Sequence, residues 1–282
     1  MVPGFHLLKS AGMYCIFAYL NSMRGRLFLC LLFIVQLSFG QTTSIDTVYS
    51  SQVKDKFVIT VRKPAGYSPA KKYHHVYMTD GSLGIGDYVF GKEKTWAATI
   101  PNSCVIIAIS HTGDWEEKRR RDFIPSEISK NAESNFGNAD KFYAFLKEEL
   151  IPRIEKSMTN KKDRVFIGHS FGGLFCLYTI LKEDKLFDKH FAISPSVWAN
   201  YNELDKIEEQ YAKTHKSLKA DITIYVGGLE FLNKVLYSTR NFYNTVSGRK
   251  YAGCWIRKNE IGNANHFSIR KPAIDRIFES LK

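Results

Sequence analysis

The sequence predicts an α/β fold in which a mostly parallel central sheet carries helices on both faces. From residue 55 onward, short apolar runs alternate with longer amphipathic stretches, which is the pattern of successive strand and helix units. Several of the apolar runs are too uniformly hydrophobic for a sheet with one face in water. Consecutive parallel strands are joined by right-handed crossovers, so the intervening helices are expected to cover both faces.

Short apolar runs, rich in β-branched and aromatic side chains, mark the expected strands. They cover residues 57–61, 74–79, 105–110, 164–168, 190–193, 222–226 and 254–257. In a sheet of this kind, ligands bind beyond the carboxyl ends of the strands. The loops that follow these runs are therefore where a functional site is expected.

The expected helices lie between the strands and repeat apolar residues at helical spacing. They cover residues 138–156, 172–182, 201–215, 231–246 and 268–281. The longest of them has one apolar stripe along its length, formed by Phe142, Phe145, Leu146, Leu150 and Ile154. Such a stripe is typical of a helix that packs against a sheet. No repeat or low-complexity linker interrupts the alternation.

The first forty residues have the composition of a signal peptide. Arg24 and Arg26 precede an apolar run over residues 27–37, and residues 38–40 read Ser-Phe-Gly. This order of charged, apolar and small residues is typical of export signals. The apolar run is shorter than the ~20 residues that span a bilayer. We expect residues 1–40 to be cleaved from an exported product, periplasmic or secreted, that keeps no membrane span.

The remaining residues, 41–282, have the length of a single α/β domain. Met23 is an alternative start of the chain, because a signal peptide that begins there has an ordinary length. Loss of residues 1–40 removes three basic and no acidic residues, which lowers the formal net charge from +12 to +9. This charge suits an acidic substrate, a polyanionic envelope or nucleic acid without selecting among them. We do not expect nucleic acid as a partner.

The cysteines give no sign of a disulfide framework or a metal site. Residues 41–282 contain Cys104, Cys176 and Cys254. Three scattered thiols have neither the even number nor the short spacing that those structures need. We interpret them as buried apolar residues and expect no metal or other cofactor.

A Gly-x-Ser-x-Gly motif lies where an expected strand passes into an expected helix. The strand over residues 164–168 runs directly into residues 168–173, which read Gly-His-Ser-Phe-Gly-Gly. In this context the motif is typical of a nucleophile elbow, a strained turn that projects the serine hydroxyl. The glycines avoid collisions with neighbouring backbone. Ser170 is the predicted nucleophile, and a merely tight turn is the alternative.

A serine hydroxyl is a weak nucleophile and needs an adjacent base. In this architecture the base follows the last strand, and His266 lies in the polar loop between residues 254–257 and 268–281. We therefore predict His266 as the general base. Among the other histidines, His111 also follows an expected strand and is the competing residue, with a role in substrate binding.

The acid that orients the base is expected after the strand over residues 222–226, where Glu230 lies. A carboxylate there accepts the Nδ1 hydrogen of His266 and stabilises the imidazolium that forms during attack. Two alternatives stay open. Either Glu230 is a helix N-terminal carboxylate favoured by the helix dipole, with Glu260 or Asp221 as the orienting acid, or a Ser-His dyad works without an acid.

The tetrahedral intermediate that forms when such a serine attacks a carbonyl carbon needs two backbone donors. Phe171, the residue after the nucleophile, is expected to supply one of them. The other is expected from the loop after residues 74–79, where Gly81 and Ser82 lie. A plain Asp-Gly turn without a catalytic role is the alternative for this loop.

Together these segments resemble the "putative esterase" family of α/β hydrolases, which includes siderophore esterases, feruloyl esterases and S-formylglutathione hydrolases. The resemblance extends over roughly residues 50–282 and is strongest toward the siderophore-esterase-like branch. It depends on residues 168–175, 194–198, 227–230 and 265–268, with further likeness in residues 119–125 and 141–146. It implies the α/β-hydrolase fold and a metal-independent serine mechanism.

The resemblance also implies two kinds of substrate contact. Arg119, Arg120 and Arg121, in the loop after residues 105–110, are expected to face the site and to hold an anionic substrate. A solvated surface run is the alternative. Trp198 is expected to form a wall of the pocket, with a tryptophan of the core as the alternative.

The sequence therefore predicts an exported serine esterase that forms an acyl-enzyme on Ser170 and acts on a small-molecule ester, of siderophore type by the resemblance. A feruloyl or acetyl esterase of plant polysaccharides is the alternative enzyme. A binding protein that keeps the fold without activity is an alternative of a different class, because a fold alone does not determine function.

Overall fold

The computed structural model describes residues 40–90, 100–125, 137–232 and 234–282. The signal peptide predicted for residues 1–40 lies outside this part of the chain, apart from Gly40. All helices and strands of the described chain belong to residues 41–282.

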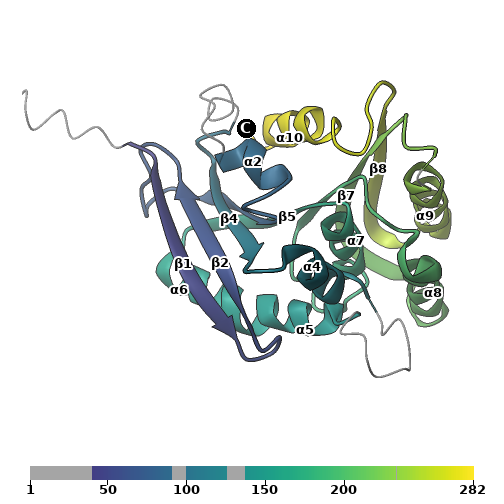
Figure 1. Ribbon diagram of the computed structural model, residues 1–282, viewed down its shortest axis with the longest axis horizontal. Coiled ribbons are helices and arrows are strands. Elements are labelled where there is room, and N and C mark those ends of the chain that lie inside the picture. The colour runs from purple at the N-terminus through teal and green to yellow at the C-terminus, as the bar shows by residue number, and fades with distance from the viewer. Residues whose placement is uncertain (1–39, 91–99, 126–136, 233) are drawn as a thin grey trace, which may run out of the picture. The chain divides into compact units, whose positions relative to one another are not determined.

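An eight-stranded sheet forms the centre of the fold (Figure 1). In chain order its strands are β1 (Thr42–Ser50), β2 (Asp55–Lys63), β3 (Tyr73–Thr79), β4 (Cys104–His111), β5 (Lys161–His169), β6 (Lys189–Ile193), β7 (Ser217–Gly227) and β8 (Ala252–Ile261). They lie side by side in the order β1-β2-β4-β3-β5-β6-β7-β8. Strand β2 is antiparallel to both of its neighbours, and all other neighbouring strands are parallel. Every expected strand is present, and the mostly parallel sheet confirms the predicted fold class.

Strand β1 is an edge strand that the apolar pattern does not predict. Only Val48 and Ser50 of its residues are buried, so it lacks the apolar run that marks the other strands. It is held by antiparallel pairing with β2 along its whole length, from Thr42 opposite Lys63 to Ser50 opposite Asp55. Its place in the sheet therefore depends on its partner strand more than on its own composition.

Helices cover both faces of the sheet. On one face lie α2 (Ile85–Phe90) and α10 (Arg270–Glu279). On the other lie α4 (Trp115–Phe123), α5 (Ala139–Ala144), the π-helix η1 (Phe145–Leu150), α6 (Ile151–Ser157), α7 (Phe171–Thr179), α8 (Ala199–Thr214) and α9 (Val235–Arg249). Successive residues of β3 alternate between the two cores, with Val76 and Met78 facing α2 and α10 and Tyr77 facing the other face.

The helix expected over residues 138–156 is present as the continuous run of α5, η1 and α6. The wide π turn ends two residues before Pro152, which has no N–H to donate to the carbonyl four residues earlier. Helix α4 occupies the segment expected to be a loop. Its sequence is mostly charged and shows no apolar stripe, but the Asp114 carboxylate caps it by accepting a 3.3 Å hydrogen bond from the backbone N–H of Glu117.

A cluster of buried phenylalanine rings fixes α7 against the sheet. Phe175 of α7 contacts Phe166 of β5 at 5.7 Å, Phe142 of α5 at 5.0 Å and Phe123 of α4 at 5.9 Å between ring centroids. Each of these rings is fully buried, and such pairs add to the stabilisation from burial alone. The cluster holds the start of α7 at the carboxyl ends of the strands.

Candidate active site

Ser170 lies in the turn between β5 and α7, at the carboxyl edge of the sheet. Its backbone has φ 59° and ψ −117°, a conformation that L residues rarely adopt and that strains the turn. The flanking glycines leave room for it. A Cβ at Gly168 would lie 2.0 Å from the carbonyl oxygen of Gly172, and a Cβ at Gly172 would lie 2.2 Å from Thr79 Oγ1. Ser170 thus occupies an elbow of the expected kind.

The structure brings His266 and Glu230 together with Ser170. Ser170 Oγ lies 3.0 Å from His266 Nε2, and His266 Nδ1 lies 2.5 Å from Glu230 Oε1. Both are hydrogen-bond distances, so side chains from three separate loops form one continuous chain of hydrogen bonds. When Nδ1 donates to Glu230, Nε2 is free to accept the serine proton.

Glu230 is almost completely buried, with 1% of its surface exposed. Its second oxygen, Oε2, accepts hydrogen bonds from Ser194 Oγ at 2.6 Å and from the backbone N–H of Gly227 at 2.7 Å. These bonds offset the cost of burying a carboxylate. Helix α9 begins only at Val235, which corrects the helix expected from residue 231. Glu230 is therefore not a helix N-terminal carboxylate.

The other acids considered for this role have different partners. Glu260 accepts two hydrogen bonds from Arg240, of 2.8 and 2.6 Å, and one from Lys258. The hydrogen bond from Arg240 lowers the pKa of Glu260 to about 2. Asp221 forms an ion pair with Arg257. Of the acids considered, only Glu230 contacts the imidazole.

A network of hydrogen bonds fixes the loop that holds His266. The side-chain oxygen of Asn265 accepts from the backbone N–H groups of Phe267 and Ser268, each at 2.9 Å. The ring of His169 donates from Nε2 to the carbonyl oxygen of His266 at 2.8 Å. Burial, followed by the positive charges nearby, holds the pKa of His169 well below its ordinary value. His169 is therefore neutral and acts as a fixed donor under the base.

Three residues at the site were not predicted as part of it. Ser196 Oγ lies 3.3 Å from Ser170 Oγ, and its backbone N–H donates to the carbonyl oxygen of Ser170 at 3.0 Å. Ser194 holds Glu230, and His169 holds the His266 loop. The available signal for the two serines is their position, because the segment Ser194-Pro195-Ser196 directly follows β6 and so lies at the same sheet edge.

The expected oxyanion donors differ in whether their backbone N–H groups already donate a hydrogen bond within the described chain. Gly81 is not free, because its backbone N–H donates to the carbonyl oxygen of Ile109 at 3.2 Å. This corrects Gly81 as a donor. The backbone N–H of Ser82 has no acceptor among the described residues. Phe171 is the first residue of α7, where the helix leaves N–H groups without an internal acceptor. Ser82 and Phe171 are the two that the geometry favours.

Arg119 lies beside the elbow but is not a free cation. Its Nε lies 2.6 Å from Asp80 Oδ1 and its Nη2 lies 3.1 Å from Asp80 Oδ2. Nη2 also lies 3.4 Å from the carbonyl oxygen of His169. Asp80 directly follows β3 and has a positive φ of 59°, which strains the turn. This turn positions the carboxylate that accepts both hydrogen bonds from Arg119. The pair fixes the guanidinium next to the nucleophile.

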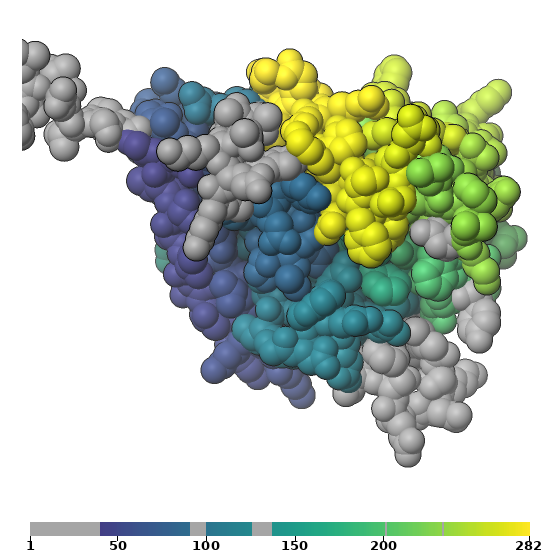
Figure 2. Space-filling view, turned by 45° about the horizontal axis from the view of Figure 1, so that its top comes forward, coloured from purple at the N-terminus to yellow at the C-terminus, as the bar shows by residue number. Residues whose placement is uncertain are grey.

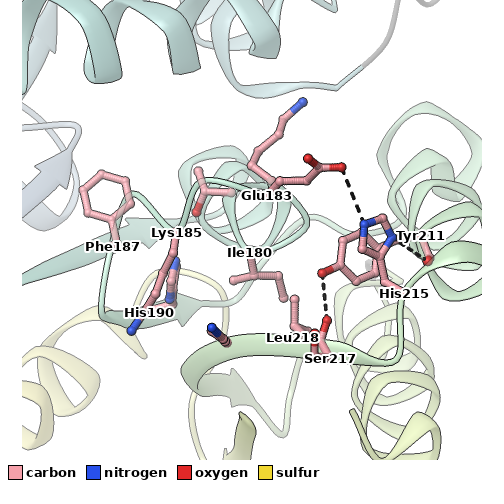
Figure 3. Close-up of a pocket in the computed structure, with 12 residues that line it drawn as sticks. Ile180, Glu183, Lys185, Phe187, His190, Tyr211, His215, Ser217 and Leu218 are labelled. Carbon is pink, nitrogen blue, oxygen red and sulfur yellow. Dashed lines mark hydrogen bonds and ion pairs between the residues drawn. The ribbon is translucent and has the colours of Figure 1, made fainter. Parts of the chain in front are cut away.

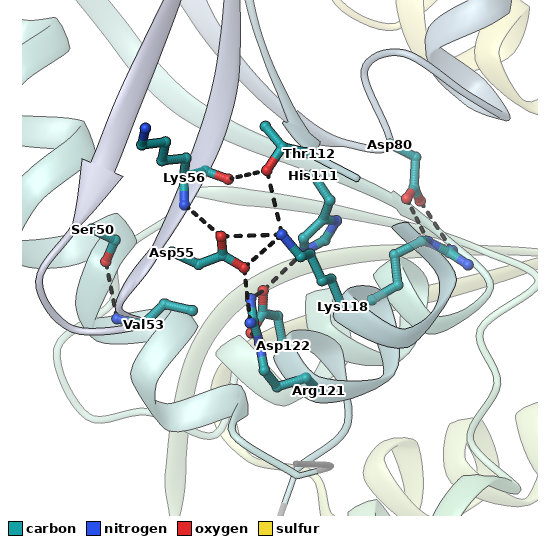
Figure 4. A network of polar contacts seen from close by, with 11 residues as sticks. Ser50, Val53, Asp55, Lys56, Asp80, His111, Thr112, Lys118, Arg121 and Asp122 are labelled. Carbon is teal, nitrogen blue, oxygen red and sulfur yellow. Dashed lines mark hydrogen bonds and ion pairs between the residues drawn. The ribbon is translucent and has the colours of Figure 1, made fainter. Parts of the chain in front are cut away.

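The other two arginines point away from the site, so the three do not form one anion-binding cluster. Arg120 lies on the exposed side of α4 and pairs with Glu116. Arg121 pairs with Asp122 and Asp55, in the polar network of Figure 4. A helix turns by about 100° per residue, so consecutive side chains diverge. The substrate role expected for Arg120 and Arg121 is therefore corrected.

His111 belongs to the same network and to the core, which corrects its expected contact with substrate. Its side chain is 2% exposed, and Nε2 lies 2.9 Å from Asp122 Oδ2 (Figure 4). Its ring packs against Phe57, Phe123 and Phe142. A side chain enclosed in this way cannot reach a bound ester.

Trp198 is not a core tryptophan, because 38% of its surface is exposed. Its ring lies 6.5 Å from that of Phe171, the residue after the nucleophile. Phe267, directly after His266, is 64% exposed. Figure 2 views this side of the molecule, with the yellow C-terminal segment that contains Phe267 above the teal segment that contains α4. Two aromatic rings therefore flank the triad in positions open to solvent.

A hollow of about 340 Å³ lies near the other ends of the strands, between α7, α8 and the start of β7 (Figure 3). It is lined by His190, Tyr211, His215 and Leu218 among others, and by none of the triad residues.

In the described part of the chain, no group of three or more His, Cys, Asp or Glu residues is arranged to hold a metal ion. The described helices also include none with the length and hydropathy needed to cross a bilayer.

The chain is similar to known esterases in sequence and in fold. The family model described as "Putative esterase" matches residues 50–267. The ferri-bacillibactin esterase BesA of Bacillus subtilis is 26% identical over 252 residues, which cover 83% of this chain and 87% of that protein. Two solved structures superpose with a TM-score of 0.70 over 85% of this chain and 94% of theirs: the BES protein from Bacillus cereus, at 23% identity, and the siderophore hydrolase EstB from Aspergillus nidulans, at 17%. At these identities the structures share the fold.

Proposed function

The chain belongs to the "Putative esterase" family and has the α/β-hydrolase fold, and from the geometry of its site we propose that it hydrolyses small-molecule esters through an acyl-enzyme on Ser170. The observation that supports this most strongly is the continuous chain of hydrogen bonds from Ser170 Oγ through His266 to the buried carboxylate of Glu230. An ester hydrolase of the serine type needs a nucleophile, a base and an orienting acid in this arrangement.

In the first half of the reaction, Ser170 Oγ attacks the ester carbonyl carbon while His266 Nε2 takes the hydroxyl proton. Glu230 stabilises the imidazolium that results. The carbonyl oxygen becomes an oxyanion, which the backbone N–H groups of Phe171 and Ser82 bind. The ion pair with Asp80 fixes the guanidinium of Arg119 beside the elbow, where Nη2 lies 3.4 Å from the carbonyl oxygen of His169. Collapse of the intermediate breaks the ester C–O bond, and His266 returns the proton to the leaving alcohol.

In the second half, a water molecule attacks the acyl carbon of the Ser170 ester. His266 takes a proton from the water, and the second tetrahedral intermediate is bound by the same donors. Collapse breaks the bond between Ser170 Oγ and the acyl carbon, His266 returns its proton to Oγ, and the carboxylic acid is released. Water, the ester and the side chains of this chain account for every atom and proton of the reaction.

Siderophore esters are the proposed substrate class. The names of BesA and EstB describe a ferri-bacillibactin esterase and a siderophore hydrolase. The exposed rings of Trp198 and Phe267 beside the triad suit a large ester with aromatic groups. A feruloyl or acetyl esterase of polysaccharides remains the second candidate, because the same rings also fit a single aromatic acyl group.

We expect the purified protein to hydrolyse ferri-bacillibactin with a kcat/KM about 100-fold or more above that for methyl ferulate and acetylated xylan. Contacts between the protein and parts of a substrate distant from the scissile bond raise kcat/KM only for the substrate that has those parts. Chromatographic product analysis measures this. A Ser170→Ala preparation controls for contaminating esterases. Preference for ferulate or acetyl esters would transfer the proposal to polysaccharide esterases, and a folded protein inactive on all three would favour a silent binding protein.

Export is also proposed, on the evidence of the charged, apolar and small residues within positions 24–40. Expression of the full chain in a bacterium with a signal peptidase is expected to yield a product that begins near Gln41, outside the cytoplasm. Cell fractionation and N-terminal sequencing measure this. A full-length product that stays in the cytoplasm would contradict export.

A further inference from the structure

Arg270 is a cation at the edge of the site. It is the first residue of α10, four positions after His266. No carboxylate among the described residues lies within ion-pair distance of it. The nearby cations are paired: Arg119 with Asp80, and Lys271 with Asp275. No carboxylate of the described residues therefore neutralises the charge of Arg270.

The surroundings of Arg270 orient its guanidinium. Nε donates a 3.0 Å hydrogen bond to the carbonyl oxygen of Phe267. The guanidinium carbon lies 5.4 Å from the ring centre of Phe267 and 5.5 Å from that of Tyr88, which are cation–π distances. Nη1 and Nη2 have no acceptor in the described chain. One edge of the guanidinium is thus held, and the other is available to a ligand.

The loop opposite Arg270 is the loop of the expected oxyanion donor. Gly84, two residues after Ser82, has a positive φ of 60°, and a Cβ built on it would lie 3.5 Å from Arg270 Nη1 and 4.0 Å from Asp80 Cβ. Arg270 therefore lies between the Ser82 loop and the His266 loop. Its positive charge is also felt at the elbow, where Arg270 and Arg119 both contribute to the lowered pKa of His169.

From this arrangement we propose that Arg270 binds a carboxylate group of the ester substrate and so selects anionic esters over neutral ones. The inference rests on the proposed esterase function. The edge of a guanidinium that Nη1 and Nη2 form matches the geometry of a carboxylate and binds it with two parallel hydrogen bonds. Arg119, expected from the sequence to bind an anion, is neutralised by Asp80, so Arg270 is the better placed of the two to bind a substrate anion.

Two matched pairs of esters test this. The first pair is p-nitrophenyl hemiglutarate and p-nitrophenyl pentanoate, which differ by a carboxylate on the acyl side. The second is O-acetylsalicylate and phenyl acetate, which differ by a carboxylate on the alcohol side. The variants are Arg270→Met, Arg270→Lys, and Arg276→Met as a matched control on the exposed side of the same helix.

We expect Arg270→Met to lower kcat/KM about tenfold for the anionic member of at least one pair, because a partly exposed hydrogen bond between charged groups contributes about that factor. For the neutral members we expect a loss of less than about twofold. Arg270→Lys is expected to recover part of the loss, and Arg276→Met to change neither. Equal losses on anionic and neutral esters would assign Arg270 to support of the His266 loop and overturn the proposal, as would no loss at all. A folded parent that hydrolyses none of the four esters would instead contradict the esterase function.

Discussion

Replacement of Ser170 by alanine is expected to lower kcat for p-nitrophenyl butyrate by about 10⁵- to 10⁶-fold, the largest effect of any single substitution in this protein. The other groups of the site act on an acyl-enzyme that cannot form without the Oγ atom. Steady-state kinetics of the purified variant measures the loss. The circular dichroism spectrum is expected to match that of the parent, because alanine only removes a hydroxyl that lies in the open turn.

The matched control is Ser196→Ala. Ser196 Oγ lies 3.3 Å from the nucleophile, and its backbone N–H holds the elbow through the carbonyl oxygen of Ser170. Alanine keeps that N–H, so a loss of less than about tenfold is expected. A Ser170→Ala variant that keeps a hundredth or more of the parent activity would contradict Ser170 as the nucleophile. A much larger loss in Ser196→Ala would move the nucleophile to that residue.

Glu230→Gln is expected to lower kcat by about 10³- to 10⁴-fold. The carboxylate accepts from His266 Nδ1 at 2.5 Å, which keeps Nε2 unprotonated toward Ser170 and stabilises the imidazolium. A glutamine of the same size carries no charge, and its amide favours the wrong tautomer of the histidine. Because Ser194 and Gly227 both donate to Oε2, glutamine keeps most of these contacts and the protein is expected to fold.

Glu260→Gln serves as the control, since Glu260 pairs with Arg240 and Lys258 and not with His266. It is expected to change kcat by less than about twofold. Rates are measured across pH 6 to 9 so that a shifted profile is not taken for a loss of activity. A loss of less than tenfold in Glu230→Gln would mean that Ser170 and His266 work as a dyad.

The triad can be predicted from the sequence because its members depend on chain order and strand ends. The Gly-x-Ser-x-Gly motif fixes Ser170, and Glu230 and His266 follow the last two strands in the order this architecture uses. Each loop begins where an apolar run ends, so a local pattern is enough to locate it. The same pattern predicts every strand except β1, whose residues are mostly exposed.

The charged residues around the triad cannot be predicted in this way. The run Arg119 to Arg121 is continuous in sequence, yet α4 turns its members toward three different sets of carboxylates. Which cation has no carboxylate partner depends on all the ion pairs around the triad. Those ion pairs join residues that are distant in sequence, so the tertiary structure decides them. Arg270 is the first residue of an ordinary helix, so its local sequence gives no sign of its role. His111 cannot contact substrate as expected, because Asp122 and three aromatic rings enclose it.

The measurement that tests the central claim most directly is covalent labelling of the nucleophile. The purified parent, Ser170→Ala and His266→Ala are each incubated with a fluorophosphonate, and the intact mass and the tryptic peptides are determined by mass spectrometry. We predict one added phosphonyl group on the parent, located on the peptide that contains Ser170, with no adduct on Ser170→Ala and a much slower reaction of His266→Ala. An unlabelled, folded parent, or an adduct that persists in Ser170→Ala, would contradict the account.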